Sequence, residues 1–69
     1  MTDYEFFEDK CKGWIKVDTY HANEAAIDRL HGLWTGVYWL SDDNHKICEM
    51  IDRYADVAKA RRDDLRGGA

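Results

Sequence analysis

Apolar side chains recur every three or four residues along most of this chain, and that period constrains the fold more than any other feature. Residues with this spacing share one face of an α-helix, so the period predicts helices that each turn an apolar face to a common core. The pattern is clearest in residues 43–65, which we expect to form one continuous helix capped by Ser41 or Asp42. Its predicted core face consists of Ile47, Ile51, Tyr54, Ala58 and Leu65, widened by Met50 and Val57.

The start of the chain carries a signature for another helix. Thr2 and Glu5 have the spacing of a capping box, in which the hydroxyl and the carboxylate each satisfy a backbone amide of the first turn. The apolar residues that follow at helical spacing are Tyr4, Phe7, Cys11 and Trp14. We expect this helix to begin at about Asp3 and to end either at Gly13, as a C-terminal cap, or at about Val17.

The segment between these two helices also has a helical pattern. Asp18, Thr19 and Asn23 are each competent N-caps for a helix that continues to about Leu40. Its broad apolar face would consist of Ala26, Ile27, Leu30, Leu33, Trp34, Val37 and Leu40.

Strands over residues 14–20 and 33–40 are the competing interpretation. β-Branched and aromatic residues cluster in both segments, and Gly32 and Gly36 each cost a helix about 1 kcal/mol relative to alanine. As a strand, however, residues 33–40 would be apolar on both faces, in a protein too small to cover both. The helix is therefore favoured, and a small α+β fold is the second choice.

The turn signal at residues 41–44, Ser-Asp-Asp-Asn, separates the last two helices. Helices of about twenty residues on either side of a short turn predict a long antiparallel hairpin, with the first helix packed across it. We therefore expect an all-α, three-helix fold in which residues 1–69 form a single domain.

A chain of 69 residues encloses a small core, and such a core alone supplies roughly 3–5 kcal/mol of stability. A partner chain is therefore expected, and a homodimer is the simplest one. Gly32 and Gly36 have the small-xxx-small spacing that lets helix backbones approach closely. Together with Trp34 they are the predicted dimer contact.

Charge and hydropathy exclude several classes of partner. Fourteen acidic and ten basic residues give the chain a net charge of −4. Binding to the phosphates of nucleic acid requires positive charge, so we expect no direct nucleic-acid binding. A basic cluster near the end of the chain consists of Lys59, Arg61, Arg62 and Arg66. Its positive charges are explained by the dipole of the last helix, whose C-terminal end favours cations. No apolar stretch approaches the roughly 20 residues that cross a bilayer, so no membrane contact is expected. An acidic N-terminal sequence favours a cytoplasmic location.

Histidine and cysteine are the first candidates for chemistry. His45 and Cys48 are three apart on a predicted helix, and Cys11, His21 and His31 could complete a zinc site. Recognisable zinc motifs have close ligand pairs at both ends, whereas only one pair is close here. The chain also lacks a nucleophile elbow and a phosphate-binding glycine loop. We expect no catalytic residue, no metal and no cofactor, and we expect both cysteines to be small core thiols.

Aromatic residues exceed what a small helical core can bury. Tyr38 and Trp39 are adjacent, so on a helix they point about 100° apart and cannot both join the core face. At least one should be exposed, beside the charges of Asp42, Asp43 and Lys46. Tyrosine and tryptophan surrounded by charge are typical of protein interfaces. We call these five residues the turn surface and predict that it binds protein.

These features together predict a non-enzymatic protein-interaction module. The most concrete form is a small acidic inhibitor of the phage type, of the anti-defence or anti-CRISPR kind, that binds and blocks a host protein or protein complex. One alternative is a regulatory accessory or antitoxin-like protein that docks on a DNA-binding partner. A small metal-binding module is another.

Overall fold

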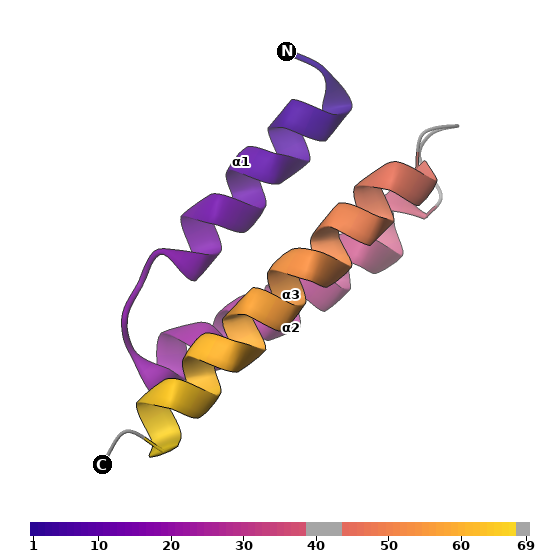
Figure 1. Ribbon diagram of the computed structural model, residues 1–69. Helices are drawn as coiled ribbons and strands as arrows, with labels where there is room; N and C mark the ends of the chain where they lie inside the picture. Colours follow the sequence, from indigo (N-terminus) through magenta and orange to yellow (C-terminus); the bar gives the residue numbers. More distant parts are fainter. Residues whose placement is uncertain (39–43, 68–69) are drawn as a thin grey trace.

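The computed structural model of the 69-residue chain describes residues 1–38 and 44–67. Within these residues the chain forms three helices and no strand: α1 (Asp3–Ile15), α2 (Tyr20–Val37) and α3 (Asn44–Gly67) (Figure 1). The prediction of an all-α, three-helix fold is confirmed.

The strand interpretation is wrong throughout the described part of both segments. Trp14 and Ile15 close α1, residues 16–19 connect α1 to α2, and residues 33–37 belong to α2. The helical cost of two glycines in α2 is outweighed because the apolar face of this helix packs against α3 over most of its length.

α1 begins where its capping signature predicts. The hydroxyl of Thr2 accepts a hydrogen bond from the backbone N–H of Glu5 at 3.2 Å. The helix ends at Ile15, between the two predicted ends, so it continues past Gly13. Gly13 therefore does not act as a cap, and no glycine in the described residues has a positive φ.

Of the three predicted caps of α2, Thr19 caps the helix and Asn23 has a different role. The hydroxyl of Thr19 accepts a hydrogen bond from the backbone N–H of Ala22 at 3.1 Å. Asn23 is fully buried, and its side-chain Nδ2 donates to the carbonyls of Val17 at 2.8 Å and Thr19 at 2.9 Å. Asn23 thus fixes the connection between α1 and α2 from inside the fold.

α3 is one continuous helix, as the period predicts, and it extends from Asn44 to Gly67 rather than ending at Leu65. The predicted caps Ser41 and Asp42, and the predicted end of the second helix at Leu40, lie outside the described residues. The predicted hairpin includes this segment and stays a prediction.

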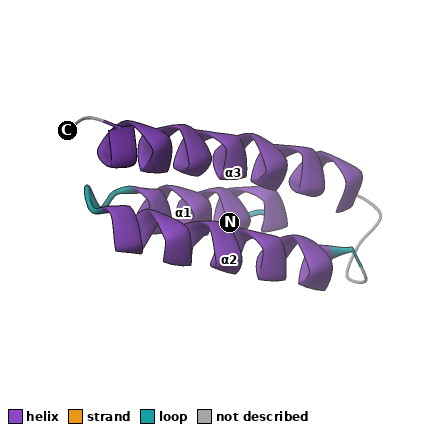
Figure 2. Ribbon diagram, turned by 90° about the horizontal axis from the view of Figure 1, so that it is seen from below, coloured by secondary structure: helices purple, strands orange, loops and turns teal. Residues whose placement is uncertain are grey.

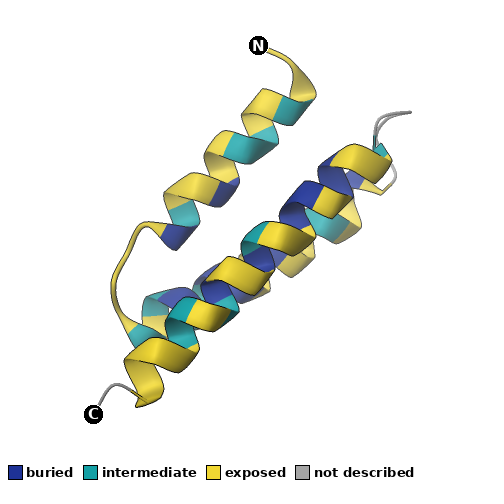
Figure 3. Ribbon diagram, viewed as in Figure 1, coloured by how far each residue is buried: buried dark blue, intermediate teal, exposed yellow. Residues whose placement is uncertain are grey.

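The core lies mainly between α2 and α3, which pack along each other; α3 lies in front of α2 in Figure 1 and above it in Figure 2. In the described residues these two helices carry ten of the twelve buried apolar side chains, and the buried surface follows their facing sides (Figure 3). α1 adds Cys11 and Ile15 and packs against both other helices. The twelve are Cys11, Ile15, Ala26, Ile27, Leu30, Val37, Ile47, Cys48, Met50, Ile51, Ala55 and Ala58.

Two residues predicted for the core face of the third helix are exposed. Val57 is 51% exposed and Leu65 is 40% exposed. Val57 faces the space between α1 and α3, where α1 does not cover it. Arg62 pairs with Glu24 in the second turn of α2 at 3.4 Å, so the start of α2 lies beside Arg62. Leu65 is three residues further along α3, where little of α2 remains to cover its side chain.

The molecule is elongated, with extents of 44 × 19 × 14 Å. The N-terminus and the described end of α3 lie at opposite ends of this long axis (Figure 1). None of the three helices, as far as the structure describes them, is long and apolar enough to span a membrane.

Candidate protein-binding surfaces

The structure describes two of the five residues of the turn surface. Tyr38 follows the last residue of α2 and is 54% exposed, as expected for one of the two adjacent aromatic residues. Lys46 lies in the first turn of α3 and is also exposed. Trp39, Asp42 and Asp43 lie outside the described residues, so their places in this surface stay predictions.

Tyr38 is exposed but held in a defined position. Its ring stacks on that of Trp34, with 5.9 Å between centroids and 17° between planes. Its backbone N–H donates to the carbonyl of Trp34 at 3.2 Å, and its own carbonyl accepts a hydrogen bond from Asn44 Nδ2 at 2.9 Å. The aromatic ring is therefore presented by a backbone that is bonded to both α2 and α3.

The three residues predicted for a dimer contact do not lie together. Trp34 is half-buried and packs against the core of its own chain. Gly32 and Gly36 are exposed on α2, and a methyl group added to either would meet no atom within 4 Å. The two glycines thus leave a flat, uncovered strip on α2, and the dimer itself stays a prediction.

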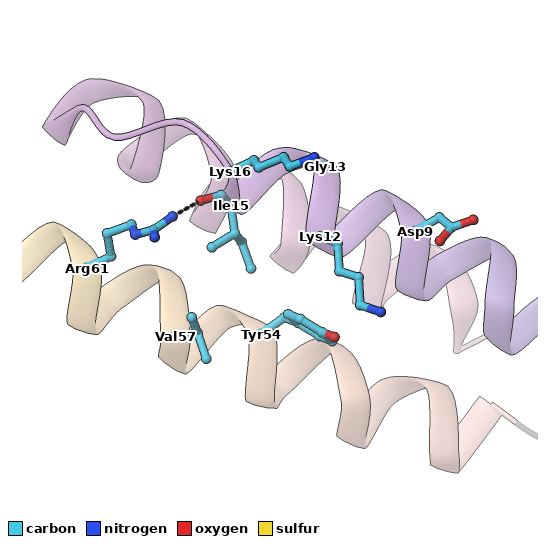
Figure 4. A pocket seen from close by; sticks show the side chains of 8 residues that line it. All are labelled: Asp9, Lys12, Gly13, Ile15, Lys16, Tyr54, Val57 and Arg61. Atoms are coloured by element: carbon cyan, nitrogen blue, oxygen red, sulfur yellow. Dashed lines mark hydrogen bonds between the residues drawn. The ribbon is translucent and has the colours of Figure 1, made fainter.

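Sequence reasoning missed a second surface, an open groove between α1 and α3. Its volume is about 590 Å³ (Figure 4). Tyr54 and Val57 rise from α3 on the side that faces α1, and Lys12 reaches down from α1 toward them. The lining residues are Asp9, Lys12, Gly13, Ile15, Lys16, Tyr54, Val57 and Arg61.

A smaller groove of about 340 Å³ shares Tyr54 and Val57 with the larger one. It extends along the same pair of helices, and its other lining residues are Tyr4, Glu8, Met50 and Arg53. We call the two together the α1–α3 groove. The signal for it in the sequence was Val57, which widens the apolar face of α3 beyond what α2 can cover.

The charges around the groove are partly paired. Lys12 lies 2.9 Å from Glu8, and this hydrogen-bonded carboxylate raises the pKa of Lys12 above its ordinary value. Arg61 lies 3.4 Å from Asp18 and donates a hydrogen bond to the carbonyl of Ile15. Lys16 and Arg53 have no ion pair within the described residues.

The arginines near the end of α3 therefore do more than complement its dipole. Arg61 bonds to the end of α1 and to the connection that follows it, and Arg62 pairs with Glu24 of α2. The last turns of α3 are thus tied to both other helices.

The histidine and cysteine candidates are spread over the fold. Cys11 and Cys48 are both buried, as predicted for small core thiols. Burial raises the pKa of the Cys11 thiol to about 11 and also raises that of Cys48. His45 is exposed and lies 3.0 Å from Glu49. Across residues 1–38 and 44–67, no three histidine, cysteine or acidic side chains lie close enough together to hold a metal ion.

Comparison with known proteins gives no relative for this chain: no protein-family model, no curated protein and no solved structure matches it.

Proposed function

We propose that this protein is a non-enzymatic binding module that acts by covering a surface of another protein, and that the turn surface makes the contact. One observation carries the proposal: Tyr38 is 54% exposed while its ring and backbone are held by Trp34 and Asn44.

An aromatic ring held in this way suits protein recognition. Tyrosine brings a large apolar contact and few rotatable bonds, and a ring that is already ordered loses little entropy when a partner covers it. Truncation of such an anchor in an interface commonly costs about 2 kcal/mol or more, which weakens binding about thirtyfold.

In the most concrete form of the proposal, the protein is a cytoplasmic inhibitor of the phage type that blocks a host protein complex. The net charge of −4 supports a partner with a basic surface, because acidic groups steer association toward such a surface. α2, the turn and α3 would form a hairpin, and the turn surface at its end would enter the blocked site.

The proposal includes a homodimer formed through the exposed strip of α2. Gly32 and Gly36 leave room for a second helix backbone to approach closely. Such a dimer would present two turn surfaces to one partner complex.

Quantitative affinity capture tests the proposed function. Tagged wild-type protein, Tyr38→Ala and Leu65→Ala are each incubated with a host lysate, and the bound proteins are compared by mass spectrometry. Leu65 is a matched control because it is an exposed apolar residue at the far end of α3. We expect one set of proteins that wild type and Leu65→Ala recover and that Tyr38→Ala loses. Equal recovery by all three variants would refute the role of the turn surface.

A further inference from the structure

The α1–α3 groove has an apolar floor that the fold leaves uncovered. Tyr54 and Val57 line both of its parts, and Val57 is 51% exposed. Ile15 and Met50 contribute from the buried core at its two ends. Apolar side chains in a groove between two helices are the arrangement that receives the apolar face of a third helix.

The length of the groove fits a short helix. Its lining runs along α1 from Tyr4 to Lys16, which at 1.5 Å per residue is roughly 18 Å. A partner helix of about 12 residues spans this distance and presents about three turns to the floor.

The charged side chains along the rim of the groove indicate which charge a partner should carry. Four basic and two acidic side chains line the groove, although the whole chain has a net charge of −4. Glu8 is paired with Lys12. Asp9 and Lys16 both line the groove from α1, and neither side chain points at α3 in Figure 4. Lys16 near one end and Arg53 near the other remain without an ion pair in the described residues. An acidic helix would therefore find a positive charge at each end of the groove.

A second copy of this chain fits the same groove poorly. In a two-fold dimer whose axis passes through the groove, the groove faces itself, so the basic rim would meet its own basic residues. Like charges brought together at an interface oppose association. The charges therefore favour a different protein as the occupant.

We propose that the α1–α3 groove binds an acidic amphipathic helix of a partner protein, whose apolar face packs on Tyr54 and Val57 and whose carboxylates pair with Lys16 and Arg53. This site is separate from the turn surface and would let the protein grip a partner at two places.

Gly13 provides a way to close the groove without disturbing the fold. It lies inside α1 and lines the groove, and a methyl group added there would meet no atom within 4 Å. A longer side chain at this position would occupy the groove instead of clashing with the core. Ala60 is the matched control, because it is also a small, exposed residue inside a helix but lines neither part of the groove.

The experiment selects helical peptides of 14 residues from a displayed library on the full-length wild-type protein. The library varies both an apolar stripe and the flanking charges. We expect the enriched peptides to carry aspartate or glutamate beside the stripe, and we expect their affinity to fall as salt rises, because exposed charges are screened over about 10 Å at 0.1 M salt. Gly13→Gln should weaken their binding at least about tenfold, while Ala60→Gln should leave it within about twofold.

Charge reversal tests the two anchoring residues in the same assay. Lys16→Glu and Arg53→Glu should each weaken the enriched peptides at least about threefold, and Arg29→Glu, an exposed change on α2, should not. Circular dichroism checks that every variant keeps its helicity. The proposal is overturned if the enriched peptides are not acidic, if no peptide is enriched, or if folded Gly13→Gln binds them as wild type does. Dissociation of a homodimer by Gly13→Gln would also overturn it, since the occupant would then be a second copy.

Discussion

Arg61 of α3 donates a hydrogen bond to the backbone carbonyl of Ile15, which ends α1 forty-six residues earlier in the chain. A helix leaves its last carbonyls without partners inside the helix, and a guanidinium from another helix satisfies one of them here. The same side chain also pairs with Asp18 in the following connection at 3.4 Å. This one residue thus sets where α1 ends relative to α3, and with it one end of the α1–α3 groove.

Arg61→Met should lower the free energy of unfolding by about 1–2 kcal/mol, because the carbonyl of Ile15 loses a charged donor. Asp18→Asn should cost less than about 0.5 kcal/mol, because the ion pair is largely exposed. Urea unfolding followed by circular dichroism measures both values. If the two variants lose the same stability, the ion pair and not the carbonyl bond holds the connection.

Asn23→Ala should destabilise the protein by about 2 kcal/mol, since two carbonyls lose the donor that Asn23 supplies inside the fold. Asp28→Ala, an exposed change on the same helix, is the control. In Asn23→Ala, backbone amide hydrogen exchange should become faster at residues 17–23 than it does in α3. A loss below about 0.5 kcal/mol would show that the connection does not depend on this side chain.

The free energy of unfolding should fall with rising pH in the range from about 9 to about 11. Burial raises the pKa of Cys11 from 9.0 to about 11, so in this range the folded protein holds a proton that the unfolded chain releases. The stabilisation is complete below the unfolded pKa and is lost as the pH rises through the folded one. Cys11→Ala lacks the thiol that holds this proton, so its free energy of unfolding, measured by urea titration at each pH, should decline less steeply. Parallel curves for the two proteins would contradict the burial of Cys11.

Light scattering at tens of micromolar should give about twice the mass of one chain, because the strip at Gly32 and Gly36 admits a second helix. Gly32→Leu should give the mass of one chain with unchanged helicity, since the added side chain meets nothing inside its own protomer. A wild-type monomer at this concentration would refute the homodimer.

Local chemistry predicted much of this fold. Thr2 and Thr19 cap their helices through hydrogen bonds that span three residues, and such bonds depend on neighbouring sequence alone. The apolar period identified the continuous helix α3 for the same reason. What the sequence could not specify is which part of a wide apolar face would be covered.

The misplaced residues follow from contacts between distant elements. Val57 has the helical spacing of a core residue, but its exposure depends on how closely α1 approaches α3. The sequence predicts a cap at Asn23 and a dipole partner at Arg61, whereas both side chains bind backbone carbonyls outside their own helix. The bonds of Asn23 span only four and six residues. The partner of Arg61 is forty-six residues away and is chosen by the tertiary fold, so no local pattern encodes that bond.

Tyr38 is the exposed, pre-ordered side chain that we propose anchors a partner protein. The most direct measurement is the dissociation constant of the captured partner for wild type, Tyr38→Ala and Tyr38→Phe, with helicity checked for each variant. Tyr38→Ala should weaken binding at least about tenfold, whereas Tyr38→Phe keeps the ring and should stay within about threefold. A folded Tyr38→Ala protein that binds the partner as tightly as wild type would contradict the proposed role of Tyr38.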